Sequence, residues 1–219
     1  MVGNKKVLSL YCYSITNQKL FTMGYTTDFE GSFKLSRPTT ETEFNYINTF
    51  SNTRRMKRDV NKLMELYKGE FGHPTRPENP YGNEGEFFVG GKGWAGQDQD
   101  DSIIDYNTPP GQPEFNGVDD FTKRWNETQR RIKNGECQPG LWCQWILTDN
   151  EELQWDGNEK FYYYVEWLKY LINNFFEEWG IKLNGEVTWV GEDSGDKGKI
   201  VVENNKVRVF EGVLSYKEI

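Results

Sequence analysis

The chain has 219 residues, a formal net charge of −8 and a pI near 4.9. A general nucleic-acid binder neutralises phosphates with a basic face, so this acidic balance argues against nucleic acid as a partner. No apolar run reaches the roughly 20 residues of a membrane-spanning helix, and the mean hydropathy is −0.82, so we expect no membrane partner. The three cysteines, Cys12, Cys137 and Cys143, form no C-x-x-C pair, which favours a reducing compartment and a cytoplasmic location.

Local patterns predict the elements of the first half of the chain. Residues 3–23 are β-rich and indicate a hairpin or an added edge strand. Alternating apolar residues over Phe29–Leu35 predict a strand. Thr40 and Glu43 form a capping box that predicts the start of a helix. A second helix is predicted from about residue 53 to Tyr67 by apolar residues at helical spacing. The segment Gly69–Pro113 is rich in glycine and proline, and we interpret it as ordered loops that line a site.

The second half contains stronger signals. A surface helix is predicted to start at Asp119 and to bury Phe121, Trp125, Thr128 and Ile132. Its basic residues are expected on the solvent side: Lys123, Arg124, Arg130, Arg131 and Lys133. Residues 141–147 and 152–155 predict a hairpin, and Asn158–Trp179 predicts a long helix that Gly180 ends. Strands are expected near residues 182–190, 198–203 and 206–216, with a tight turn at Asn204-Asn205.

The order of these elements is that of a split β-α-β-β-α-β unit. The predicted fold is therefore α+β: a ferredoxin-like or related antiparallel sheet with helices on one face, extended by a C-terminal β-meander and by the long Gly/Pro-rich ordered loop region. Because no internal linker divides the chain into self-sufficient halves, we expect a single domain over residues 1–219.

Several motifs taken together resemble a family of small uncharacterised proteins of phages and bacteria. The resemblance spans residues 23–216 and depends on Gly24–Phe29, Gly31–Leu35, Thr53–Asp59, Gly85–Gly91, Gly96–Asp98, Asp105–Asn107, Gly140–Trp145, Trp155–Gly157, Lys160–Tyr164, Glu166–Leu168, Leu183–Val187 and Gly191–Asp193. Relative to that family, residues 1–22 are an N-terminal extension and residues 114–137 a helical insertion. The resemblance implies no established activity and no catalytic residues. It implies a phage context, in which small acidic proteins act on host proteins or host signalling molecules.

Basic residues at the predicted start of the second helix form the sharpest candidate site. Arginine guanidinium groups bind phosphate oxygens two at a time, and basic charge at a helix start opposes the helix dipole, so the cluster invites a functional explanation. The alternative is a solvated helix face that pairs with the excess carboxylates. The cluster comprises Arg54, Arg55, Lys57 and Arg58.

The glycine-rich loop after residue 89 supplies the other candidate ligand groups. Gly91 would bring backbone amides close to a phosphate, although a hairpin turn explains the Gly90–Gly93 run more simply. Trp94 would stack on a planar ligand, while Gln97, Asp98 and Asp101 would bind its polar groups. The aspartates do not fit a calcium-binding EF-hand loop, but they leave a looser magnesium site open.

The residue types in the sequence give little support for a catalytic site. The sole histidine, His73, lies in a Gly-His-Pro loop that suggests exposure, so no Ser-His-Asp or Cys-His mechanism is expected. Cys143 lies between two tryptophans and is interpreted as a small core residue. No cofactor motif is found.

Three hypotheses for function follow. The first is a non-catalytic protein that binds and sequesters a nucleotide-like signalling molecule as a phage counter-defence, with Arg54, Arg55 and Arg58 holding phosphate. The second is an inhibitor that binds a host protein through the 119–134 helix or the aromatic residues of 161–179. The third is a metal-assisted phosphoester hydrolase that uses the aspartates. A homo-oligomer remains open in each case.

Overall fold

The protein is α+β in a computed structural model that describes residues 25–90, 100–114, 118–148 and 151–213. Nothing is described for the side chains of residues 118–121. The predicted β-rich segment 3–23 lies outside the described residues. A large antiparallel sheet has the order β4-β5-β1-β6-β7-β8. Its strands are β1 (Thr27–Leu35), β4 (Trp145–Leu147), β5 (Glu152–Trp155), β6 (Leu183–Gly191), β7 (Lys197–Glu203) and β8 (Lys206–Glu211).

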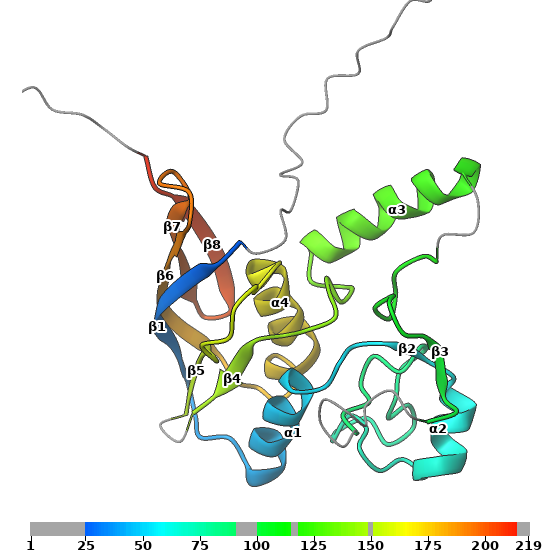
Figure 1. Cartoon of the computed structure of the whole chain (residues 1–219). Coiled ribbons are helices and arrows are strands. Elements are labelled where there is room, and N and C mark those ends of the chain that lie inside the picture. The colour runs from blue at the N-terminus through cyan, green and yellow to red at the C-terminus, as the bar shows by residue number, and fades with distance from the viewer. Residues whose placement is uncertain (1–24, 91–99, 115–117, 149–150, 214–219) are drawn as a thin grey trace, which may run out of the picture.

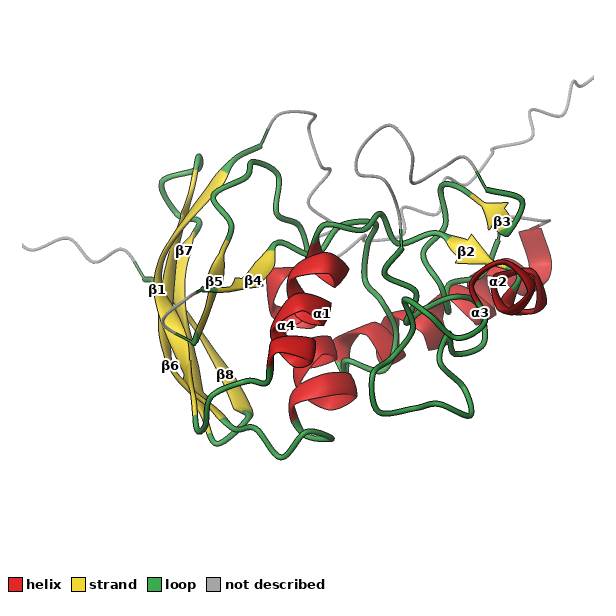
Figure 2. Cartoon of the chain, turned by 90° about the horizontal axis from the view of Figure 1, so that it is seen from below, coloured by secondary structure: helices red, strands yellow, loops and turns green. Residues whose placement is uncertain are grey.

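The helices lie on one side of this sheet, as the nearly edge-on view of Figure 2 shows. Two helices, α1 and α4, form the layer next to the sheet, and α4 continues directly into the π-helix η1 (Figure 1). A small two-stranded sheet, β2-β3, and α2 lie beyond that layer, on the side away from the large sheet. The bounds are α1 (Glu41–Ser51), α2 (Val60–Tyr67), α3 (Val118–Lys133), α4 (Tyr164–Leu171), η1 (Ile172–Phe176), β2 (Lys57–Arg58) and β3 (Ile103–Asp105).

Strand β1 lies inside the sheet, between β5 and β6. It pairs with β6 along its whole length, from Thr27↔Gly191 to Leu35↔Leu183. Side chains point alternately to the two faces of the sheet along each strand. Phe33 on β1 and Val187 on β6 face the helices and are buried, whereas the residues next to them in each strand face outward. The strands predicted at Phe29–Leu35, 152–155, 182–190 and 198–203 are therefore confirmed.

A glycine opposite a large ring shapes the sheet next to its edge. Gly198 on β7 pairs with Trp189 on β6, and a Cβ atom at Gly198 would overlap the indole ring of Trp189. The missing side chain lets the indole lie over the neighbouring strand, where Trp189 is 5% exposed. A glycine inside a strand often marks such a close approach.

The core between sheet and helices is strongly aromatic. The capping box of Thr40 and Glu43 starts α1 as predicted, and Ile47 and Phe50 point into the core. From α4 and η1, Trp167 and Phe175 are fully buried and contact the Phe50 ring edge-on. Full burial of such side chains contributes about 1.5–3 kcal/mol each, so this layer stabilises the molecule.

Three predicted element boundaries are wrong. The second helix begins at Val60, after an N-cap formed by Asp59, so the basic cluster precedes it in an extended segment and does not oppose its dipole. The long helix begins at Tyr164 instead of Asn158, although Gly180 follows its last turn with a φ of 69°. The first strand of the predicted hairpin covers only Trp145–Leu147. Each boundary depends on tertiary contacts that local patterns do not contain.

Among the described residues, no helix combines the length and the apolar character needed to cross a lipid bilayer.

Candidate functional site

The structure buries the central arginine of the basic cluster. Arg55 is 1% exposed, and burial lowers its pKa to about 10, which still leaves the guanidinium charged at neutral pH. Its nitrogens donate to the main-chain oxygens of Phe88 at 2.8 Å and Glu86 at 2.6 Å, and to Oε1 of Gln138 at 3.3 Å. Arg55 therefore holds the 85–88 loop against the core.

The other two predicted arginines also have protein partners. Arg58 is 2% exposed and donates to Oδ2 of Asp100 at 2.5 Å. Arg54 is partly exposed, donates to the Tyr106 carbonyl oxygen at 3.3 Å and lies over the Tyr106 ring. The structure therefore places Arg54, Arg55 and Arg58 in three separate sets of contacts, and it does not bring them to one open surface.

Of the five predicted loop residues, Asp101 lies in the described part of the chain. Gly91, Trp94, Gln97 and Asp98 lie outside the described residues. Asp101 is exposed, and its carbonyl oxygen accepts a hydrogen bond from Nζ of Lys62. In the part of the chain that the structure describes, no group of three or more His, Cys, Asp or Glu residues could hold a metal ion.

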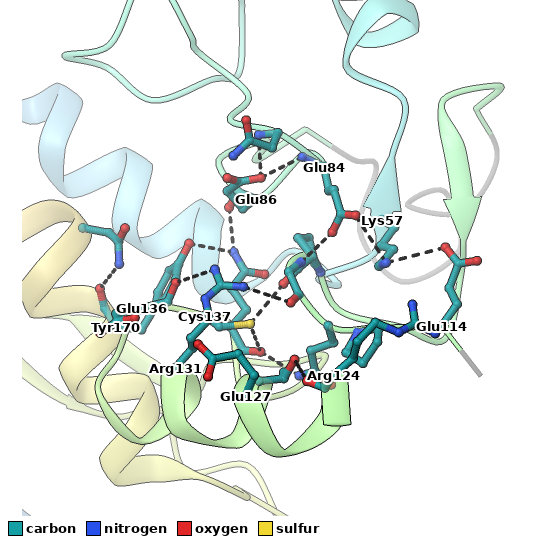
Figure 3. A pocket seen from close by; sticks show the side chains of 18 of the residues that line it. Lys57, Glu84, Glu86, Glu114, Arg124, Glu127, Arg131, Glu136, Cys137 and Tyr170 are labelled. Atoms are coloured by element: carbon teal, nitrogen blue, oxygen red, sulfur yellow. Dashed lines mark hydrogen bonds and ion pairs between the residues drawn. The ribbon is translucent and has the colours of Figure 1, made fainter. Parts of the chain in front are cut away.

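A hollow in the described structure lies between α3 and two loops. Its volume is about 810 Å³, within the range of small-molecule sites. One wall is the inner face of α3, and the others come from residues 83–87 and 110–114 (Figure 3). Tyr170 of α4 and Asn174 of η1 close the end nearest the core.

Four basic side chains line this pocket. Lys57, the fourth member of the predicted basic cluster, is buried beside Glu84 at 3.3 Å and Glu114 at 3.5 Å. The other three come from α3: the adjacent residues Lys123 and Arg124, and Arg131 about two turns further along the helix. Arg131 donates only to the main-chain oxygens of Gly111 and Glu136, both at 3.5 Å, and forms no ion pair with any described residue.

Five carboxylates also line the pocket, and each has a described hydrogen-bond or ion-pair partner. Glu86 accepts from the main-chain amides of Asn83 and Glu84, each at 2.8 Å. Glu84 accepts from the amide of Gly111 at 2.6 Å in addition to its contact with Lys57. Glu127 is paired with Arg130, and Glu136 accepts from Asn134. Glu114 contacts Lys57 and is 47% exposed. The hydrogen bonds that Glu84 and Glu86 accept from main-chain amides therefore fix the shape of the two loops.

A hydrogen-bond network supports the floor of the pocket. The amide of Gln138 donates to the carbonyl oxygen of Glu86 at 2.7 Å and to the Tyr170 hydroxyl at 3.1 Å. Burial raises the pKa of Tyr170 well above its ordinary value, so its hydroxyl stays protonated. Arg55, which does not line the pocket, donates to Oε1 of the same Gln138. The predicted arginine thus supports the pocket through Gln138 without lining it.

The π-helix connects the pocket to α3. Asn173 donates to the carbonyl oxygen of Asn134 at 2.8 Å and Asn174 to that of Gly135 at 3.3 Å, so both hold the end of the α3 segment. The carbonyl oxygen of Asn174 lies 3.0 Å from Nε2 of His73. The histidine side chain is fully buried, so the predicted exposure of His73 is wrong. Short π-helical turns are frequent at functional sites.

Nucleophilic chemistry is disfavoured in this pocket. Its thiol belongs to Cys137, which is 3% exposed, and burial raises the pKa of that thiol to about 11. A neutral thiol is a poor nucleophile. The residues that line the pocket include no histidine that could act as a base. Cys143 is fully buried and its pKa is raised to about 12 by burial, which confirms it as a core residue.

The α3 side of the pocket was missed by sequence reasoning. The helix was predicted, but its basic residues were assigned to its solvent side. The available signal was the spacing of Arg124, Thr128 and Arg131, which lie on one helical face at intervals of four and three. Thr128 is 5% exposed, which shows that this face is turned inward.

No protein-family model, no curated protein and no solved structure matches the chain. This result agrees with the resemblance to a family without an established activity.

Proposed function

We propose that the protein binds a nucleotide-like anionic small molecule in the α3 pocket and does not convert it chemically. The observation that carries this proposal is Arg131, a guanidinium that lines a pocket of about 810 Å³ and has only main-chain oxygens as described partners. Lys57, Lys123 and Arg124 line the same space. A charge-assisted bond to a phosphate would be stronger than the two long contacts that Arg131 makes in the free protein.

The lining residues also offer partners for the uncharged parts of a nucleotide. Asn83, Thr128 and Asn174 present amide and hydroxyl groups to the pocket. The aromatic residues Phe87 and Tyr170 are only 4% and 3% exposed, so they offer little surface for stacking. We expect polar contacts, more than stacking, to select the ligand.

A matched pair of arginines on α3 tests the proposal. Isothermal titration calorimetry with nucleoside monophosphates, nucleoside triphosphates and cyclic dinucleotides should identify a ligand with a dissociation constant of about 10 µM or below. Arg131→Gln should weaken its binding by about tenfold or more, as expected for the loss of one charged hydrogen bond. Arg130→Gln should change it less than about twofold, because Arg130 is exposed, pairs with Glu127 and does not itself line the pocket. Heat from none of these nucleotides, or equal effects of the two substitutions, would remove the proposal.

In the cell, the proposed role of the protein is to sequester the nucleotide that it binds. A protein that binds a signalling nucleotide without converting it lowers the free concentration of the signal, which is the counter-defence role expected in a phage context. The raised thiol pKa of Cys137 and the absence of histidine from the pocket lining support binding over catalysis. Recovery of the bound nucleotide unchanged after hours of incubation, measured by chromatography, is the expected result.

One observation favours the protein-binding alternative. The N-terminal end of α3 stands clear of the other helices (Figure 1). The aromatic residues of 161–179 give less support, because Phe161, Trp167 and Phe175 are buried in the core. If α3 binds a host protein, Asn126→Arg on its exposed side should block complex formation with that protein and leave nucleotide binding unchanged.

The finer fold assignment belongs with this proposal. The strand order β6-β1-β5-β4, with α1 between β1 and β4 and α4 between β5 and β6, supports a ferredoxin-like arrangement, because a split β-α-β unit places its strands in this way. Strands β7 and β8 follow β6 as successive antiparallel neighbours, which supports the C-terminal meander. The segment with α2, β2, β3 and α3 would then be an elaboration between α1 and β4.

A further inference from the structure

A second hollow lies on the helix-facing side of the sheet near the β8 edge. Its volume is about 730 Å³, and none of its lining residues belongs to the α3 pocket. Val209 on β8 pairs with Ile200 on β7, which pairs with the buried Val187 on β6. The three side chains therefore lie on the same face of the sheet, and Val209 forms part of the floor of the hollow. Val209 is nevertheless 44% exposed, so the helices leave this end of the apolar face open.

Consecutive aromatic residues form the wall opposite the strand. Phe161, Tyr162, Tyr163 and Tyr164 all line the hollow at the start of α4. Tyr163 has a φ of 56° and Lys160 a φ of 64°, conformations that cost a non-glycine residue on the order of 1 kcal/mol each. The wall is therefore held in a defined and strained shape. Rings on one side and valine on the other suit a flat apolar ligand.

One end of this hollow is basic. Lys133 and Lys169 line it, and both also line a smaller neighbouring hollow that includes Val207, two residues before Val209 on the same face of β8. Nζ of Lys169 donates to the carbonyl oxygen of Lys133 at 2.9 Å. Neither ammonium forms an ion pair with a residue in the described ranges, although the carboxylate of Glu166, in the first turn of α4, also lines the hollow.

The other end is acidic but partly occupied. Asp193 and Asp196 belong to the turn between β6 and β7, which lies near the last residues of β8. The carboxylate of Asp196 accepts from the Tyr25 hydroxyl at 2.5 Å and from the Trp189 indole at 3.3 Å. An anionic group would therefore be attracted to the lysine end and repelled from the turn, which sets the direction of a ligand in the hollow.

We infer that this hollow is a binding site for a planar aromatic molecule that carries an acidic group. The ring system lies between Val209 and the tyrosine wall, and the acidic group contacts Lys133 and Lys169. This site is separate from the proposed nucleotide pocket and does not depend on it.

The test uses a fluorescent aromatic acid, 8-anilinonaphthalene-1-sulfonate, and its neutral analogue N-phenyl-1-naphthylamine. The full chain should bind the sulfonate at one saturable site, with a dissociation constant of about 100 µM or below, and the neutral analogue about tenfold more weakly. Equal affinity for the two probes, or no saturable binding of the sulfonate, would overturn the inference.

Matched variants locate the site. Val209→Glu should weaken sulfonate binding by about tenfold or more because it introduces a charge into the apolar floor. Val190→Glu is the control, because Val190 is 58% exposed and lies next to Trp189 on the opposite face of the sheet. Lys133→Gln should weaken binding by about fivefold and Lys206→Gln should leave it unchanged. Unchanged affinity in both Val209→Glu and Lys133→Gln would show that the probe binds elsewhere.

The two proposals can fail separately. Arg131→Gln should leave sulfonate binding unchanged, and Val209→Glu should leave nucleotide binding unchanged, because the two pockets share no lining residue. Loss of sulfonate binding in Arg131→Gln would assign the probe to the α3 pocket and overturn the second site.

Discussion

The guanidinium carbon of Arg55 lies 4.1 Å from the centre of the Phe50 ring, inside the core and not at the surface. The ring covers one face of the guanidinium, while main-chain oxygens from residues 86 and 88 surround its edge. A charged group in such a place is stable only because its hydrogen bonds are satisfied. Arg55 thus joins helix α1 to a loop more than 30 positions further along the chain.

Replacing this arginine should destabilise the protein strongly. Arg55→Met keeps an apolar stem but leaves the Phe88 carbonyl oxygen and Oε1 of Gln138 without this donor, and it removes one of the two donors to the Glu86 carbonyl oxygen. The free energy of unfolding should therefore fall by roughly 3–5 kcal/mol. Urea unfolding followed by tryptophan fluorescence measures this loss. Arg54→Met is the control, since Arg54 is partly exposed and should lose less than about 1 kcal/mol. Similar unfolding midpoints for the two variants would contradict the structural role of Arg55.

A second prediction concerns the ion pair of Arg58. Asp100 accepts from Arg58 and from the hydroxyl of Ser102. Burial acts to raise the pKa of Asp100, but these hydrogen bonds outweigh it and hold the pKa below its ordinary value. Asp100→Asn removes the negative charge beside a buried guanidinium and should cost roughly 2–4 kcal/mol at pH 7. Asp101→Asn should cost less than about 0.5 kcal/mol, because that side chain is exposed.

The pKa of Asp100 also gives this pair a pH dependence. A carboxyl with a depressed pKa in the folded state contributes stability that is fully present above its ordinary pKa, and that contribution is lost as the pH falls further. The difference in stability between the wild type and Asp100→Asn should therefore shrink below about pH 4. A constant difference down to pH 3 would mean that the carboxylate does not stabilise Arg58 through its charge.

The third prediction tests the close approach of β6 and β7. Gly198→Ala places a Cβ where the Trp189 ring and the Phe210 carbonyl oxygen lie. Overpacking of this kind costs about 1–3 kcal/mol, which in a chain of this size lowers the melting temperature by roughly 2–12 °C. Gly195→Ala is a matched control, because no atom lies within 4 Å of an added Cβ there. Equal melting temperatures for the two variants would show that β6 and β7 can separate without cost.

The sequence predicted those parts of the fold that local patterns determine. The capping box at Thr40, the alternation through β1 and the asparagine turn before β8 each depend on residues a few positions apart. Asn204 and Asn205 both have positive φ, as a tight hairpin turn requires. Such features appear in the structure at or near the predicted positions.

The candidate site could not be predicted in the same way, because charge along a chain does not indicate burial. Arg55 and Arg58 are of the residue type that binds phosphate, but their burial depends on partners that are 30 or more positions away in the sequence. Conversely, Arg131 was assigned to the solvent side of its helix, and only the packing of α3 against residues 110–114 makes it line a pocket. Long-range pairing decides both outcomes.

The last prediction concerns the protonation of His73. Because His73 is the only histidine in the chain, no other imidazole contributes to the measured titration. Burial lowers its pKa below the ordinary value of 6.5, assisted by the charge of Arg76, while the hydrogen bond to Asn174 and the charge of Glu178 oppose that shift. The unfolded chain therefore takes up a proton at His73 at a higher pH than the folded protein does. Stability from neutral His73 is fully present above pH 6.5 and is lost as the pH falls through that value toward the folded pKa.

The measurement is the free energy of unfolding in urea at pH 7.5 and at pH 5.5. We expect the wild type to lose stability between these two values, and we expect His73→Gln, although less stable at pH 7.5, to show little change between them. The carboxyl of Glu178 has a lowered pKa and so contributes its own pH dependence only at lower pH. The imidazole resonances of the single histidine in an NMR titration report the folded pKa directly. A folded pKa at or above 6.5, or an equal pH slope in His73→Gln, would contradict the buried, neutral state of His73 that links the 71–76 loop to the π-helix.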